Sequence, residues 1–181
     1  MLASLLVPIV LSAVVLFFAS FLSWMILQLH KDDWRRIDRE DEFLAAVRPF
    51  NLPEGSYMFP RPVTPADMKS EAFQAKYKAG PRGVMTILAP TNMGVNLAMT
   101  MAYFLVVSLG LGYLASIAFP TPGASFMNVF RFVFTAGLFT FLAGVVQHSI
   151  WFRNRIVGHV IESILYAAIV GVLFAAMWPE K

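Results

Sequence analysis

Four long apolar stretches dominate the pattern of hydrophobic and polar positions along the chain. They cover Leu5–Leu29, Val95–Phe119, Phe126–Phe152 and Ile156–Met177. About 20 apolar residues in a helix cross the hydrocarbon core of a bilayer, and a helix pairs its own backbone amides where lipid offers no partner. The pattern therefore predicts an all-α membrane protein, a four-transmembrane-helix bundle with a short-helix cytoplasmic cap between helices 1 and 2.

The charged residues are concentrated in the gap between the first and second apolar stretches. Ten of the 14 Lys and Arg residues and nine of the 11 Asp and Glu residues lie between Lys31 and Arg82. We therefore divide the chain into a first transmembrane helix (1–29), a cap segment (30–94) and transmembrane helices 2–4 (95–181). Seven of the 11 prolines fall in the cap segment, so short helices should alternate there with extended connectors.

The positions of Lys and Arg predict the orientation, because cytoplasmic loops of membrane proteins carry an excess of both residues. The cap segment holds ten of them and the turn at 152–155 holds two, whereas the opposite side has only Lys181. We expect both termini outside and the cap segment in the cytoplasm. Residues 1–25 have neither a basic leading region nor a small-residue cleavage site, so we interpret them as an uncleaved first span.

Two elements are expected at the start of the cap segment. The first span should continue as a helix beyond the membrane surface, through His30 and Trp34. A short helix is then predicted from Arg39 to Val47, with Asp38 as its N-cap, because Pro49 cannot continue it. Mixed acidic and basic residues around this helix are typical of a solvated face.

The clearest start signal in the cap segment is Thr64-Pro65-Ala66-Asp67. Thr64 can act as an N-cap, Pro65 suits the first helical position, and the carboxylate of Asp67 can bond back to the amide of the cap residue. A helix is predicted to follow as far as Lys78, where Gly80-Pro81 ends it.

Four cations are expected to contact lipid or a partner. Three lie at the basic end of this helix: Lys76, Lys78 and Arg82. They could rest on anionic lipid headgroups, or instead complement the helix dipole in solvent. Arg131 lies inside the third span, about 9 Å from its outer end at 1.5 Å per residue. It should extend to the outer surface, or bond to Tyr113, Ser116 or carbonyls near the end of the second span. A functional alternative is contact with an acidic partner helix or a lipid headgroup.

Small residues predict close packing between the third and fourth spans, because they let membrane helices approach one another. A short turn joins these spans, so they should form an antiparallel hairpin. The residues assigned to this packing are Gly137, Gly144, Ser163, Ala167, Gly171 and Ala175.

Three ionisable residues in the same hairpin form the candidate site. His148 and His159 lie at equal distances from the midpoint of the turn, roughly 8 Å into the membrane by helix rise. Glu162 follows His159 by one helical turn. The three side chains could ligate a divalent metal or handle protons or ions. Alternatively they hydrogen-bond to one another and set the register of the hairpin.

Several classes of function are excluded or disfavoured. The chain has no cysteine, which excludes disulfides, thiolate metal sites and thiol catalysis. The net charge is only +3, which gives no argument for nucleic acid as a partner. No Ser, His and Asp arrangement has the motif context of a nucleophilic enzyme. No cofactor is predicted, apart from a divalent metal as an alternative.

Three stretches carry a resemblance to a known family. They are the run from Asn51 to Pro60, the run from Lys76 to Pro81, and the charged Trp-containing stretch from His30 to Arg36. They are similar to stretches in a family of bacterial four-span integral membrane proteins that has no assigned activity. The resemblance implies a location in the bacterial inner membrane and transfers no site residue.

Three functions follow as hypotheses. The first is a non-catalytic accessory, scaffold or assembly subunit of the inner membrane, with other membrane proteins or further copies of the chain as partners. The second is a small oligomeric transporter or a proton or ion pathway that uses Glu162, His148 and His159. The third is a membrane-embedded metal-dependent enzyme built on the same three residues.

Overall fold

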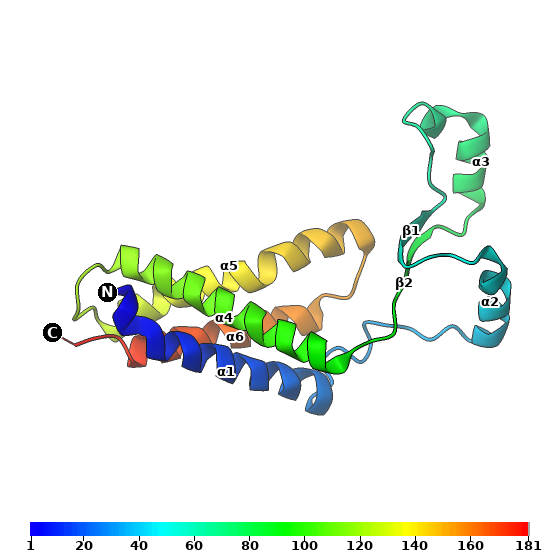
Figure 1. Cartoon of the computed structure of the whole chain (residues 1–181). Helices are drawn as coiled ribbons and strands as arrows, with labels where there is room; N and C mark the ends of the chain where they lie inside the picture. The colour runs from blue at the N-terminus through cyan, green and yellow to red at the C-terminus, as the bar shows by residue number, and fades with distance from the viewer. Residues whose placement is uncertain (181) are drawn as a thin grey trace. The chain divides into compact units, whose positions relative to one another are not determined.

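The computed structural model describes residues 1–180 and contains four long helices (Figure 1). Helix α1 (Leu6–Phe21) is extended by a 3-10 turn before it (Leu2–Leu5) and by a π-helical turn after it (Leu22–Ile26). The other three are α4 (Met93–Ala118), α5 (Phe126–Phe152) and α6 (Val157–Ala176). All four are long and apolar enough to cross a membrane, so the chain is a multi-pass membrane protein by length and composition.

The predicted spans are confirmed as helices. The third span has the expected bounds, Phe126–Phe152, and the largest difference is at the first span, which was expected at Leu5–Leu29 and occupies Leu2–Ile26. Span positions depend on local hydropathy and on helix length, which explains the agreement.

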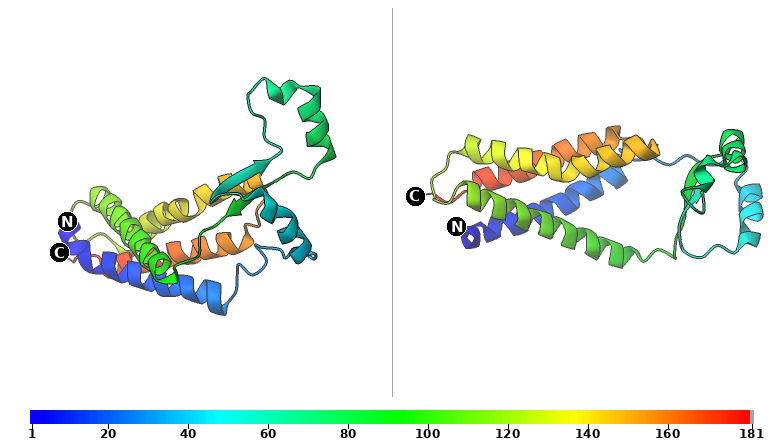
Figure 2. Two further views of the ribbon diagram at one scale, coloured as in Figure 1. Left: turned by 45° about the vertical axis from the view of Figure 1, so that its right-hand side comes forward. Right: turned by 90° about the horizontal axis from the view of Figure 1, so that it is seen from above.

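The chain divides into two compact units, one containing residues 1–35 and the described residues from Met93 onward, the other containing residues 36–92. In the first, which we call the helical unit, the four helices lie side by side with alternating directions (Figures 1 and 2). The start of α1 and the end of α6 lie at the same end of the bundle (Figure 1).

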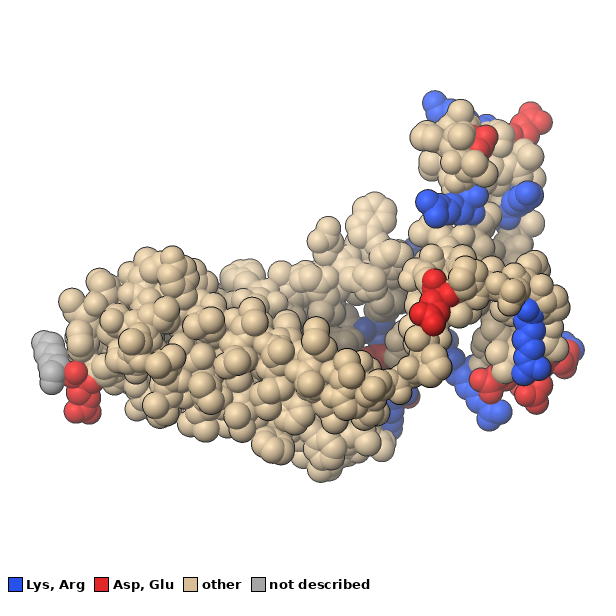
Figure 3. All heavy atoms as spheres, in the orientation of Figure 1, with Lys and Arg blue, Asp and Glu red and all other residues tan. Residues whose placement is uncertain are grey.

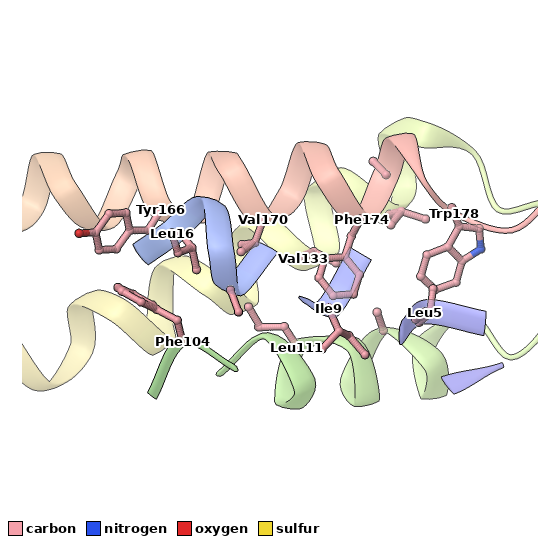
Figure 4. Packing of buried hydrophobic residues seen from close by; sticks show 14 of the residues in the cluster. Leu5, Ile9, Leu16, Phe104, Leu111, Val133, Tyr166, Val170, Phe174 and Trp178 are labelled. Carbon is pink, nitrogen blue, oxygen red and sulfur yellow. The ribbon is translucent and has the colours of Figure 1, made fainter. Parts of the chain in front are cut away.

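Apolar side chains from all four long helices fill the core of the helical unit (Figure 4). Ile9, Leu111 and Phe174 are each at most 3% exposed. Leu5 and Trp178 belong to the same buried cluster. Exposed apolar side chains cover the outside of the helices, as expected where lipid is the solvent.

Small residues mark where the helices approach most closely. A methyl group on Gly112 would lie 2.9 Å from Ile9 Cδ1 on α1, and one on Gly137 would lie 3.3 Å from Val170 Cγ2 on α6. Of the residues assigned to helix packing, the structure buries Gly137, Ser163, Ala167, Gly171 and Ala175. Gly144 differs, because a methyl group there would meet nothing within 4 Å.

Helices α5 and α6 separate toward the turn that joins them (Figure 1). The rings of Phe141 and Tyr166 pack between them edge to face, with centroids 5.5 Å apart. Two aromatic rings between helices need more room than small side chains such as glycine. The two helices are therefore farther apart here, and Gly144 does not contact α6.

Residues 36–92 form the second unit, which we call the hairpin unit. It contains α2 (Glu40–Val47), β1 (Gly55–Phe59), α3 (Glu71–Ala79) and β2 (Gly83–Ile87). The two strands pair antiparallel, from Gly55 opposite Ile87 to Phe59 opposite Gly83. The expectation of an all-α chain is therefore correct for the four spans and incomplete for this unit.

Figure 3 shows charged side chains on the hairpin unit, whereas the visible length of the helices is uncharged.

The helix starts of the hairpin unit differ from prediction in detail. Arg39, not Asp38, is the N-cap of α2, and its side chain makes no capping bond. Thr64 and Asp67 do form the expected reciprocal pair, with amide-to-oxygen distances of 2.7 and 3.3 Å. The pair lies at the start of a 3-10 turn (Asp67–Lys69), whose N-cap is Ala66, rather than at the start of α3. That helix starts later because the hydroxyl of Ser70 accepts a bond from the amide of Phe73, 3.2 Å away.

Candidate functional site

The chain turns back on itself at the end of the first span. The amide of Leu27 donates to the carbonyl of Leu22, which is π-helical spacing, and Gln28 has a positive φ of 49°. Two consecutive turns follow. In the second turn the amide of Asp33 donates to the carbonyl of His30. The prediction of a helix continuing through His30 and Trp34 is therefore wrong. A left-handed residue ends the helix and redirects the chain.

This reversal brings the loop after α1 against the first turn of α6. A methyl group on Gly158 would lie 2.6 Å from the carbonyl oxygen of Leu29, closer than real contacts of this kind. Glycine is therefore required at this position for the approach of the two backbones. As a result His30 is only 3% exposed and its ring faces α6.

His30 lies between two carboxylates. Its Nδ1 is 2.8 Å from Oδ2 of Asp33, and its Nε2 is 3.2 Å from Oε2 of Glu162. The hydroxyl of Tyr166 donates to the other oxygen of Glu162 over 2.5 Å. Both oxygens of Glu162 thus have partners, which offsets the cost of placing a carboxylate that is 9% exposed within the bundle.

A second histidine completes the cluster. Nε2 of His159 lies 3.3 Å from the same Asp33 oxygen that contacts His30. The rings of His30 and His159 have centroids 4.4 Å apart, and Trp24 stacks on His30 at 4.1 Å. We call His30, Asp33, His159 and Glu162, together with Tyr166, the histidine–carboxylate cluster.

The ring nitrogens of both histidines face carboxylate oxygens. Oδ2 of Asp33 contacts Nδ1 of His30 and Nε2 of His159, and Oε2 of Glu162 contacts Nε2 of His30. Imidazole nitrogens and carboxylate oxygens can share protons or bind a metal ion.

A peripheral ion pair flanks the cluster. Nη1 of Arg155 lies 3.4 Å from Oδ2 of Asp32, and both side chains are more than half exposed. Among the described residues, the ligand atoms of His30, Asp33 and His159 form a group close enough to hold a metal ion, all within 4.8 Å of one another.

The structure brings together part of the predicted site. His159 and Glu162 both belong to the cluster, but they are linked through His30 and Asp33 rather than directly. His148 does not join them. It is exposed, its ring lies against Phe152 with centroids 4.5 Å apart, and within residues 1–180 it makes no hydrogen bond or ion pair with the cluster.

Sequence reasoning missed His30 and Asp33. The available signal was their spacing of three residues directly after an apolar span, which suits a side-chain pair across one turn. This spacing did not identify the two residues as part of the site, because the predicted continuing helix would carry His30 away from α6.

The cations predicted to contact lipid or a partner are all exposed. Arg131 lines an open groove of about 540 Å³ with Phe119 and Asn128. Among residues 1–180, the alternative bond from Arg131 to Tyr113 or Ser116 is not formed, and the Ser116 hydroxyl donates instead to the carbonyl of Tyr113. In the hairpin unit Lys76 and Lys78 are exposed, and the guanidinium of Arg82 lies 4.7 Å from the ring centroid of Tyr77.

Comparison of the chain with models of protein families, with curated proteins and with solved structures finds no match. The resemblance to bacterial four-span membrane proteins therefore rests on the sequence stretches quoted for it.

Proposed function

We propose that the chain is a non-catalytic accessory or assembly subunit of the bacterial inner membrane. The membrane assignment is supported by four helices able to span a bilayer. The excess of Lys and Arg between the first two spans supports outer termini and a cytoplasmic hairpin unit. The family resemblance supports a bacterial source.

The observation that carries the proposal is the composition of the hairpin unit's surface. No residue from 36 to 92 is buried, although the unit has two helices and a two-stranded sheet. Large apolar side chains lie open instead: Val63 is 94% exposed, Leu88 is 75% exposed and Phe50 is 72% exposed. A two-stranded hairpin is marginally stable alone, and a partner that covered these exposed apolar side chains would remove them from water. The unit is therefore built to be completed by a partner protein.

The core of the helical unit supports an accessory role over transport. Leu16, Val170 and Phe174 are fully buried in the bundle (Figure 4). Within the described chain, the hydroxyls of Ser12 and Ser108 are buried there without a hydrogen-bond partner. An ion or proton pathway needs a succession of polar groups or water. Among the described residues, the buried core of the bundle is formed mainly by apolar side chains.

The test is the composition of the complex obtained in mild detergent from native membranes. We expect a second membrane protein in fixed stoichiometry, measured by native mass spectrometry. Val63→Asp should release it, while the matched substitution Glu54→Gln, also at an exposed position of the hairpin unit, should retain it. A chain that is found alone in every mild detergent contradicts the proposal, as does equal retention by both variants.

A further inference from the structure

We propose that His30, Asp33 and His159 bind a divalent transition metal of the zinc class, held between the end of the first span and the first turns of α6. The site differs from the one expected from sequence, because His30 and Asp33 take the places of His148 and Glu162 as ligands. It does not depend on the proposed accessory function.

The spacing of the donor atoms suits such an ion. Zinc binds imidazole nitrogen and carboxylate oxygen at about 2.0–2.2 Å in a tetrahedral arrangement, which places neighbouring ligand atoms about 3.3 Å apart. The Asp33 oxygen lies 2.8 Å from Nδ1 of His30 and 3.3 Å from Nε2 of His159. All three donors fall within 4.8 Å of one another. Small side-chain rotations therefore suffice to close them around one ion.

The surroundings of His30 supply an independent argument. A metal-bound histidine usually donates its other ring N–H to a carboxylate, which orients the ring and raises its basicity. Nε2 of His30 faces Glu162 at 3.2 Å, and Glu162 is itself held by the hydroxyl of Tyr166. With the metal on Nδ1, Nε2 of His30 would donate its proton to the carboxylate of Glu162.

The charges of the cluster also favour a divalent cation. Asp33 and Glu162 contribute two negative charges beside two histidines, and a doubly charged ion balances them with both rings neutral. The nearby charges Asp32 and Arg155 already pair with each other. Two nitrogens and one oxygen form the donor set that zinc accepts with water as fourth ligand.

An entry path is present. A cavity of about 190 Å³ opens beside Asp33 and is lined by Leu29, Asp32, Arg155 and Gly158 among others. Arg155 pairs with Asp32 in this lining, so Asp33 is the carboxylate that would attract a cation from solution.

The test is zinc binding by the full chain in mild detergent, purified with a tag that contains no histidine. After equilibration with Zn²⁺ and removal of free ion, elemental analysis should find one zinc per chain, and Mg²⁺ should not bind. His159→Ala should lose the zinc. Glu162→Gln should weaken affinity by about 10- to 100-fold, as expected for an orienting carboxylate. His148→Ala is the matched control, since His148 is an exposed histidine outside the cluster, and it should bind as the wild type does.

Zinc retained by His159→Ala, or lost from His148→Ala, would overturn the proposal. Should His159→Ala fail to fold, Co²⁺ in the wild-type chain provides the second measurement. Tetrahedral coordination by nitrogen and oxygen gives intense visible absorption that hydrated Co²⁺ lacks. A spectrum of the hydrated ion would rule out the site.

Discussion

Gly158→Ala should detach the loop after α1 from α6 without removing any polar side chain. The added methyl group would lie 2.6 Å from the carbonyl oxygen of Leu29, whereas ordinary contacts begin at 3.4 Å. The carbonyl must therefore retreat by about 0.8 Å, as in other overpacked sites. His30 follows Leu29 directly, and its bond to Glu162 is already long at 3.2 Å. A retreat of this size takes that bond beyond hydrogen-bonding distance.

The energetic cost can be worked from these contacts. Overpacking costs about 1–3 kcal/mol, and the hydrogen bond to a charged group contributes about 1.5–3 kcal/mol. Alanine has a higher helix propensity than glycine, which offsets about 0.5–1 kcal/mol of this cost. A net loss of about 2–5 kcal/mol lowers the unfolding midpoint by roughly 4–20 °C in a chain of this size.

The assay is thermal unfolding in mild detergent, followed by circular dichroism at one scan rate for all variants. Gly110→Ala is the control, because a methyl group on that helical glycine meets nothing within 4 Å. It should leave the midpoint unchanged or raise it slightly. If Gly158→Ala unfolds at the same temperature as Gly110→Ala, the approach between Leu29 and α6 does not stabilise the fold and the reasoning fails.

Three further substitutions separate other contacts. Glu162→Ala leaves His30 and Tyr166 without their buried partner and should cost about 2–5 kcal/mol, seen as a lower unfolding midpoint; a midpoint equal to that of the wild type would show that the cluster contributes nothing. Gly137→Leu should be strongly destabilising in the same measurement and Gly144→Leu tolerated, since only Gly137 contacts α6; equal effects would contradict the separation of α5 and α6. Ser70→Ala should cost α3 about 1 kcal/mol by removing its cap, measured as faster amide hydrogen exchange over residues 71–79, and unchanged exchange would count against that cap.

Part of the candidate site could be predicted from the sequence. Counting residues from the turn between α5 and α6 correctly identified His159 and Glu162 as polar residues near one end of the bundle. The same count placed His148 at equal depth, but depth along a helix does not establish contact with a neighbouring helix. The rings of Phe141 and Tyr166 hold α5 away from α6 before His148 is reached, so that histidine remains exposed.

The sequence by itself determined the four spans, because length and hydropathy decide whether a helix can cross a bilayer, and both are local properties. It likewise determined the concentration of charge between the first two spans. Only the tertiary structure decided which polar groups meet. The π-helical turn, the positive φ of Gln28 and the missing side chain of Gly158 together return His30 and Asp33 to α6. That result depends on backbone conformation and on contact between segments more than 120 residues apart, which no local pattern of hydrophobic and polar residues encodes.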